Sequence, residues 1–212
     1  MRTYVIAIVG LDGAGKTTQA RALAEALRAA GHDATSVHPS NDLIALVPGG
    51  ERIKRRLVGW LHRPTLASRA TRRLLMVLLG YPFALLSIVL ARYRYRGRIV
   101  VFDRYRYQFL HDCYGPLAPA LVHTLPSPDR TIRLTADPGT LRGRTSGRDS
   151  ERPREYYRAG RRFHDRLGAE LGWETVRTDR SVERVGERVF DAVAGSGTPI
   201  EHAAGDGPLT DR

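Results

Sequence analysis

The sequence is nearly devoid of cysteine: Cys113 is the only one among its 212 residues. A single cysteine cannot form a disulfide within the chain, which excludes a disulfide-stapled scaffold and suits a reducing compartment, so we expect a cytoplasmic protein. Cysteine and histidine also form no cluster with the spacing of a metal site. Cys113 is therefore expected to fill a small apolar space rather than to act as a nucleophile.

Lysine is almost as scarce. Of the 34 basic residues only Lys16 and Lys54 are lysine, and with 22 acidic residues the net charge is +12. A basic balance of this size favours anionic partners such as nucleotides, nucleic acids or acidic membranes. Compositional bias of the source genome would give the same arginine surplus. When lysine is so rare, its presence within a glycine-rich loop indicates a chemical role for Lys16.

Internal repeats are absent, and the first apolar run, Tyr4–Val9, is too short for a signal peptide. The length suits one α/β domain with a sizeable core. We expect that domain to cover residues 1–194. From Gly195 the sequence is rich in glycine and proline without periodicity, which predicts a disordered tail over residues 195–212.

The stretch Gly10–Thr18, GLDGAGKTT, matches the phosphate-binding pattern G-x-x-x-x-G-K-[ST]. It stands between the strand-like run Tyr4–Val9 and a helical pattern over Gln19–Ala30. The glycines let successive backbone N–H groups point at phosphate oxygens, and the helix N-terminus adds partial positive charge. The pattern predicts that Lys16 reaches the β- and γ-phosphates and that the Thr17 hydroxyl binds Mg²⁺. The full set expected to bind nucleotide is Gly10, Asp12, Gly13, Ala14, Gly15, Lys16, Thr17 and Thr18.

Strand and helix patterns alternate along the rest of the chain and predict a parallel sheet covered on both faces. The expected strands are Ala34–Val37, Arg98–Phe102, Arg130–Leu134 and Trp173–Val176. The expected helices include Tyr156–Leu171, with Tyr156, Gly160, Phe163, Leu167 and Leu171 on its apolar side. A last helix begins after Ser181, with Val182, Val185, Val189 and Val193 turned inward.

Ligands of such sheets bind at the carboxyl ends of the strands. Asp103 follows the strand Arg98–Phe102, which is the usual place for a second magnesium ligand or a water-positioning acid, and Arg104 comes next. The arginine-dense segment Leu141–Arg154 follows another strand. Together with the glycine-rich loop, these signals predict one nucleotide site. A short helix carrying Arg52, Arg55 and Arg56 is expected within the polar stretch 40–64.

The stretch Leu74–Ala91 carries no charge and reaches the lower length limit of a membrane span. Gly80-Tyr81-Pro82 divides it, so we expect two helices or one kinked helix, largely buried, and a homodimer interface on this segment. Association with a membrane surface is the alternative. A nucleic-acid partner is not expected, since no known nucleic-acid motif occurs.

The chain resembles the thymidylate kinase family of nucleoside monophosphate kinases. The resemblance rests on GLDGAGKTTQ (10–19), on Asp103-Arg104-Tyr105, on an arginine-rich lid around 142–154, and on EYYRAGRRF (155–163). It implies a three-layer α/β/α P-loop NTPase fold with a five-stranded parallel sheet, and ATP and Mg²⁺ as cofactors. The implied catalytic residues are Lys16, Asp103, Arg104, Arg142 and Arg148, the implied metal ligands are Thr17 and Asp103, and Asp179 would lie near the adenine.

The resemblance weakens in the acceptor half of the site. Where the family has R-E-P-G-G after the second strand, this chain has VHPSN (37–41). The family's A-D-R-x-x-H element is replaced by the uncharged stretch 80–91. Three functions stay open: a dTMP kinase, a related phosphotransferase for a nucleoside or sugar derivative, and a non-catalytic nucleotide-binding module that docks on membrane or nucleic acid. His111 and Asp112 could face the acceptor, although a structural polar pair is the commoner explanation.

Overall fold

The computed structural model describes residues 2–38, 52, 69–145 and 153–195. Its strands are β1 (Tyr4–Val9), β2 (Ala34–Val37), β3 (Ile99–Asp103), β4 (Arg130–Thr135) and β5 (Glu174–Arg177). Its helices are α1 (Lys16–Ala29), α4 (Arg69–Arg94), α5 (Tyr107–Tyr114), α6 (Ala118–Val122), α7 (Pro138–Arg144), α8 (Arg154–Leu171) and α9 (Val182–Ala194), and a 3₁₀ turn η1 (Gly115–Leu117) joins α5 to α6.

The five strands form one parallel sheet in the order β2-β3-β1-β4-β5. β1 lies at its centre, and Val5 to Val9 are at most 2% exposed. A strand buried on both faces is an unbroken apolar run, as this one is. In the register between β1 and β3, Ile8 lies beside Asp103. The strand ends therefore bring the start of the glycine-rich loop next to that carboxylate.

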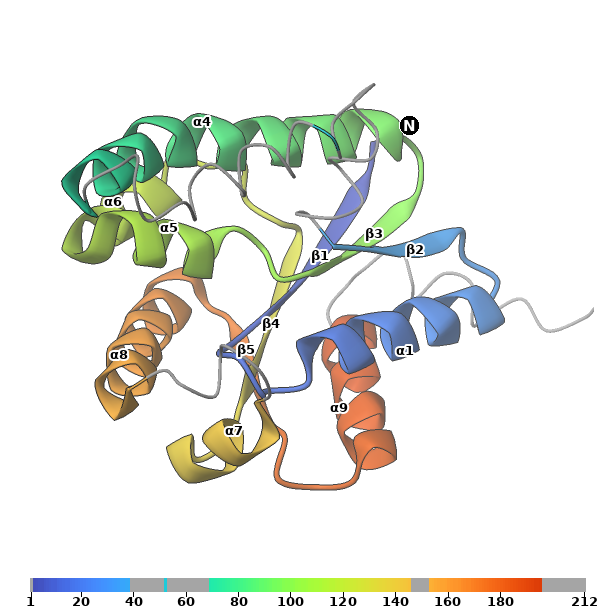
Figure 1. Ribbon diagram of the computed structural model, residues 1–212. Helices are drawn as coiled ribbons and strands as arrows, with labels where there is room; N and C mark the ends of the chain where they lie inside the picture. Colours follow the sequence, from blue (N-terminus) through green and yellow to red (C-terminus); the bar gives the residue numbers. More distant parts are fainter. Residues whose placement is uncertain (1, 39–51, 53–68, 146–152, 196–212) are drawn as a thin grey trace, which may run out of the picture.

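Helices cover both faces of the sheet (Figure 1). On one face α1 and α9 pack together, and Leu27 and Val189 belong to one buried apolar cluster. On the other face α4, α5 and α8 contribute Ile88, Leu110 and Leu167 to a second cluster. The expected three-layer α/β/α fold with a five-stranded parallel sheet is thus confirmed.

Several predicted faces and boundaries differ from the structure. α1 begins at Lys16, within the glycine-rich motif, because the loop ends at Gly15, which is the N-cap residue of the helix. In α8 the buried aromatic is Tyr157 rather than Tyr156, and the terminal Leu171 is 37% exposed. Val182, expected inside, is 53% exposed at the first position of α9, whereas Val185 and Val189 further along the helix are buried.

The apolar stretch Leu74–Ala91 departs most from its prediction. It lies within a single continuous helix, α4, with Pro82 in its interior. Its inner side is buried, but the prediction that the stretch is largely buried is wrong, because one helix on a sheet turns only one side to the core. By length and composition Met76–Arg94 could span a membrane, with mean hydropathy 1.7 and 28% of it buried. Its exposed large apolar residues are Leu74, Met76, Val77, Leu78, Leu79, Leu86, Val89 and Tyr93.

Some expectations cannot be compared with the structure. Arg148 of the expected lid lies outside the described residues, as do Arg55 and Arg56 of the expected short helix. The predicted tail lies outside them from residue 196 onward. Cys113 is buried, and burial raises the pKa of its thiol to about 11, which agrees with a packing role.

We predict that His164 makes the fold sensitive to acid. Burial, and then the charge of Arg133, lower the pKa of this 1%-exposed imidazole to about 3. The unfolded chain takes up a proton near pH 6.5 whereas the folded one does not, so stability falls as the pH falls below about 6.5, by up to roughly 1.4 kcal/mol per pH unit. In urea unfolding between about pH 7 and pH 5, His164→Gln should flatten this slope. The exposed-site control His123→Gln should keep it, and an equal slope in all three proteins would contradict the assignment.

Candidate active site

Glycine shapes the loop between β1 and α1 by allowing close backbone contacts. Gly10 (φ +143°) and Gly13 (φ +84°) have backbone conformations that other residues rarely adopt. A Cβ atom at Gly10 would lie 2.3 Å from the Leu134 carbonyl oxygen, and one at Gly13 would lie 2.3 Å from that of Leu141. The loop therefore sits directly against the end of β4 and against α7, and a side chain at either glycine would push it away.

Lys16, the first residue of α1, turns its side chain back into this loop. Its Nζ donates a hydrogen bond to the Leu11 carbonyl oxygen at 2.6 Å and lies 3.5 Å from Asp12 Oδ1. Burial, and then the nearby Arg104 charge, lower the pKa of Lys16 to about 8, while Asp12 and Asp103 act in the opposite direction. The ammonium group is thus partly desolvated, and an incoming phosphate would offer it a stronger partner than a neutral carbonyl.

Asp103 ends β3 and is 2% exposed. Its Oδ1 has no hydrogen-bond partner among the described residues. A buried carboxylate oxygen without a partner is costly, and a bound cation would satisfy it. The Thr17 hydroxyl stands exposed in the first turn of α1, at the same end of the sheet.

This donor set fits Mg²⁺, which is usually held by one or two protein oxygens together with substrate phosphates. Accordingly, the described part of the chain contains no group of three or more metal-ligating His, Cys, Asp or Glu residues. Thr17 and Asp103 are the residues that would hold the ion.

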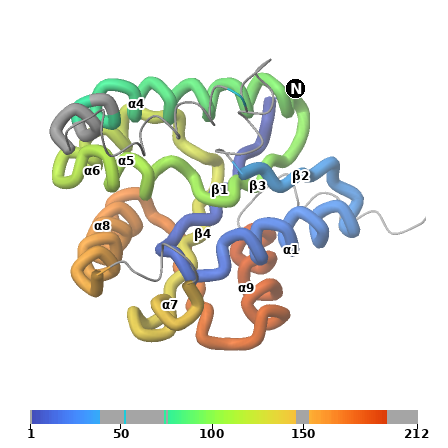
Figure 2. The backbone as a smooth tube through the Cα atoms, in the orientation of Figure 1, coloured from blue at the N-terminus to red at the C-terminus, as the bar shows by residue number. Residues whose placement is uncertain are grey.

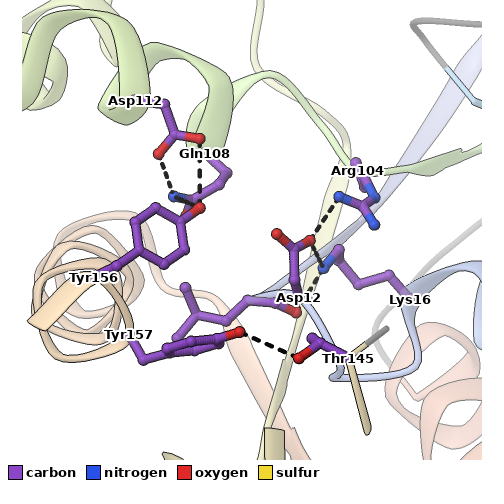
Figure 3. A network of polar contacts seen from close by, with 9 residues as sticks. Asp12, Lys16, Arg104, Gln108, Asp112, Thr145, Tyr156 and Tyr157 are labelled. Carbon is purple, nitrogen blue, oxygen red and sulfur yellow. Dashed lines mark hydrogen bonds and ion pairs between the residues drawn. The ribbon is translucent and has the colours of Figure 1, made fainter. Parts of the chain in front are cut away.

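Arg104 is the one non-glycine residue with positive φ (+70°) in the described part of the chain. Such a conformation costs about 1–3 kcal/mol and is concentrated at functional sites. Its N–H donates to the Ile8 carbonyl oxygen at 3.2 Å, and its Nη1 donates to Asp12 Oδ1 at 2.6 Å (Figure 3). The strained backbone therefore places the guanidinium beside the glycine-rich loop, a feature that the sequence did not reveal.

The expected lid is described only in part. Arg142 is exposed on α7, directly after Leu141, whose carbonyl abuts Gly13. Arg144 Nη1 donates to the Thr178 carbonyl oxygen at 2.8 Å and so links α7 to the loop after β5. In that loop the exposed Asp179 accepts from Arg177 Nε at 3.1 Å. The structure thus brings Arg142 near the glycine-rich loop.

A polar network between α5 and α8 was not predicted as such. Gln108 Nε2 donates to Asp112 Oδ1 at 2.8 Å and to the Tyr156 hydroxyl at 3.1 Å, and that hydroxyl lies 3.4 Å from Asp112 Oδ2. Figure 3 shows these three side chains on one side of the view and Asp12, Lys16 and Arg104 on the other. The arrangement gives the site a second, polar wall.

Close packing of α8 against the loop brings this wall to the site. A Cβ atom at Gly160 would lie 2.5 Å from Leu11 Cδ2 and 3.7 Å from Gln108 Oε1. The glycine within an amphipathic helix was the available sequence signal for this contact. His111, by contrast, packs its ring against Phe163 at 4.6 Å. Of the two residues named as facing the acceptor, Asp112 is therefore the one in the polar wall.

We predict that Lys16 takes up a proton when MgATP binds. With a pKa of about 8 in the free protein, roughly three quarters of the Lys16 side chains are uncharged at about pH 8.5, and a phosphate partner restores the charge. Titration calorimetry in two buffers of different ionisation enthalpy should detect uptake of roughly 0.7 proton per site. Near pH 7 the same protein should show almost none, and equal uptake at both pH values would contradict the prediction.

Comparison with known proteins agrees with this geometry. A family model described as thymidylate kinase matches residues 8–189, which include the glycine-rich loop, Asp103 and α8. A curated protein of Ruegeria pomeroyi named thymidylate kinase is 32% identical over 204 residues, which cover 90% of each chain. The chain therefore belongs to the thymidylate kinase family, and it is a phosphotransferase of the nucleotide kinase type.

Proposed function

We propose that this kinase transfers the γ-phosphoryl group of ATP, bound with Mg²⁺, to a nucleoside monophosphate, with dTMP as the preferred acceptor. One observation carries the proposal. Lys16 and Asp103, both at most 5% exposed, lie beside the glycine-rich loop, and the Asp103 charge opposes the lowering of the Lys16 pKa by burial and by Arg104. A buried ammonium group beside a buried carboxylate is the arrangement required to hold a metal-bound triphosphate.

Phosphoryl transfer needs positioning and positive charge around the equatorial oxygens rather than a covalent nucleophile. The chemistry that Mg²⁺ would supply when bound is positive charge beside the phosphate oxygens. Thr17 and Asp103 would hold the ion. The loop amides would cradle the phosphates, and Lys16 would exchange its bond to the Leu11 carbonyl for one to a phosphate oxygen.

Arginine would supply the further positive charge. Arg104 is already directed at the loop by its backbone and by Asp12, so it would reach a transferring phosphoryl group without a large rearrangement. Arg142 extends from α7 at the same edge, and Arg148 is proposed to act with it. A role for Asp179 near the adenine stays a prediction.

The cellular setting also stays a proposal. We propose a cytoplasmic enzyme, because the lone Cys113 is buried and needs no oxidising compartment. The family assignment favours catalysis over the non-catalytic nucleotide-binding module considered above.

The first test removes the Asp103 charge. Asp103→Asn keeps the shape of the side chain but weakens the metal site, so kcat for dTMP-dependent ADP formation should fall by about 100-fold or more. The matched control is Asp33→Asn, an exposed aspartate whose described ion pair is with Arg98. The control should retain wild-type activity, and activity retained by Asp103→Asn would refute the proposed role of this carboxylate.

A second acceptor class has a specific observation in its favour. The polar wall carries a carboxylate, Asp112, which would repel an acceptor phosphate but could accept hydrogen bonds from hydroxyl groups. The inner side of α4, which packs against α5, lacks charge along 74–91. These features favour a nucleoside or sugar derivative phosphorylated at a hydroxyl group.

Asp112→Asn separates the two acceptor classes. If the acceptor is a hydroxyl compound held by this carboxylate, the variant should raise its KM by about ten-fold or more. If the acceptor is dTMP, removal of a repulsive charge should leave KM unchanged or lower it. The measurement is a coupled ADP-release assay with dTMP, other nucleoside monophosphates, thymidine and sugars, with Asp33→Asn as control. Stimulation by dTMP alone would exclude the hydroxyl class, and stimulation only by a hydroxyl compound would exclude dTMP.

A further inference from the structure

We propose that the outer side of α4 docks the enzyme onto a bilayer surface containing anionic phospholipids, with the helix lying in the plane of the interface. The surface is defined by Leu78, Leu79, Pro82, Leu86, Val89 and Tyr93, all of which are exposed. The proposal does not depend on which acceptor the kinase uses.

The exposed residues of α4 between Leu74 and Tyr93 are all apolar. From Leu79 to Tyr93 these residues recur every three or four positions, and Leu78 lies four positions before Pro82, so they form one stripe along the helix. At 1.5 Å per residue the stripe is about 22 Å long. Leu78 is 59% exposed, Leu86 55% and Tyr93 67%. A helix facing water would have polar residues at these positions, and a contiguous apolar stripe marks a binding surface.

The inner side of the same helix is built into the domain. Ala84, Ile88 and Ala91 are at most 1% exposed within the apolar cluster shared with α5. Arg106 Nε donates to Ser87 Oγ at 2.8 Å in a buried contact, and Thr3 Oγ1 donates to the Arg92 carbonyl oxygen at 2.9 Å. To span a bilayer, α4 would have to leave this packing and expose a buried arginine. It can therefore lie on a membrane while the domain stays folded.

Charge identifies the membrane surface as the partner. Between Glu51 and Asp103 the chain has no acidic residue, yet it has 12 of the 34 Lys and Arg residues. The other positions then hold 22 basic and 22 acidic residues, so the whole net charge of +12 originates in the segment that contains α4. An apolar helix with arginine at both ends, as in α4, has the composition that binds anionic lipid.

The carboxyl end of α4 combines aromatic and basic groups as interfacial segments do. The Arg96 guanidinium lies over the ring of the exposed Tyr93, 4.9 Å from its centroid. Beside it is a hollow of about 570 Å³ lined by Arg2, Thr3, Arg92, Arg96 and Gly97. Arg92 Nε is buried without a hydrogen-bond partner among the described residues. Arg2 is ion-paired with Asp129 and Arg92 Nη2 donates to the Ser127 carbonyl oxygen, so a lipid phosphate at this hollow would meet chiefly the guanidinium group of Arg96 and the remaining N–H groups of Arg92.

A second copy of the chain fits this surface less well. A two-fold dimer through α4 would bring together two copies of a helix that has arginine at both ends and no carboxylate to balance it. An anionic bilayer supplies the missing negative charge. The phosphate loop stays accessible, because α4 covers the sheet face opposite to α1 and α9 (Figure 2).

The test is flotation of the full-length protein with vesicles of phosphatidylcholine alone or with about 30 mol% phosphatidylglycerol. Wild type should bind the anionic vesicles at low salt, bind neutral ones far less, and be released as salt rises. Leu86→Asp with Val89→Asp should weaken binding at least about ten-fold, because two apolar contacts are lost and two negative charges are added. Arg94→Glu with Arg96→Glu should weaken binding to the anionic vesicles specifically.

The matched controls lie on α9. Val182→Asp changes an equally exposed apolar residue, and Arg188→Glu changes an exposed arginine. Both should bind like wild type, and circular dichroism should show that every variant is folded. If the α4 variants and the α9 variants reduced vesicle binding to the same extent, the proposal would be overturned. So would a dimer in light scattering that Leu86→Asp with Val89→Asp dissociates. If the wild-type protein did not bind vesicles and Leu86→Asp with Val89→Asp lowered its thermal stability, the proposal would be wrong. The stripe would then be assigned to a contact within the chain.

Discussion

The site depends on a single lysine ammonium group that the fold buries almost completely from solvent. Lys16 is 5% exposed, and its Nζ is held by the Leu11 carbonyl oxygen at 2.6 Å. Asp12 and Asp103 offset part of the desolvation of this cation, and the same two carboxylates shape the rest of the site. Asp12 binds Arg104 as well, so two positive groups share one negative partner. Both cations are thereby held beside the glycine-rich loop, where the phosphates of a nucleotide would bind.

The sequence predicted those parts of the molecule whose chemistry is local. The glycine motif, the apolar run before it and Asp103 at a strand end all follow from short-range patterns, and the five strands lie close to where they were expected. The strain at Arg104 could not be predicted, because arginine rarely adopts a φ of +70° and the contacts of this residue are with Ile8 and Asp12, which are distant in sequence. The network of Gln108, Asp112 and Tyr156 likewise joins two helices that meet only in three dimensions.

The error over α4 has the same physical origin. An apolar pattern on all sides of a helix predicts burial on all sides, and the sequence does not reveal how many neighbours the helix has. In the fold α4 has the sheet and α5 on its inner side, where small residues such as Ala84 and Ala91 allow close approach. On its outer side the stripe from Leu78 to Tyr93 stays exposed. The composition of the segment therefore predicted a helix. Which side of that helix is buried could be known only from the arrangement of its neighbours in the fold.

The central strand relates the two surfaces to each other. Thr3, at the arginine-lined hollow, directly precedes β1, and Gly10, the first glycine of the phosphate loop, directly follows it. Six residues of extended chain span about 20 Å, so the hollow and the loop lie at opposite ends of the sheet. In an enzyme held on a bilayer, the hollow and the glycine-rich loop would therefore lie at opposite ends of β1. The amino-terminal half of α4, by contrast, packs against α5, where Gly80 faces Cys113 and Tyr114. Because α5 also carries Gln108 and Asp112, the α4 stripe runs from the arginine-lined hollow toward the helix that forms the polar wall of the site.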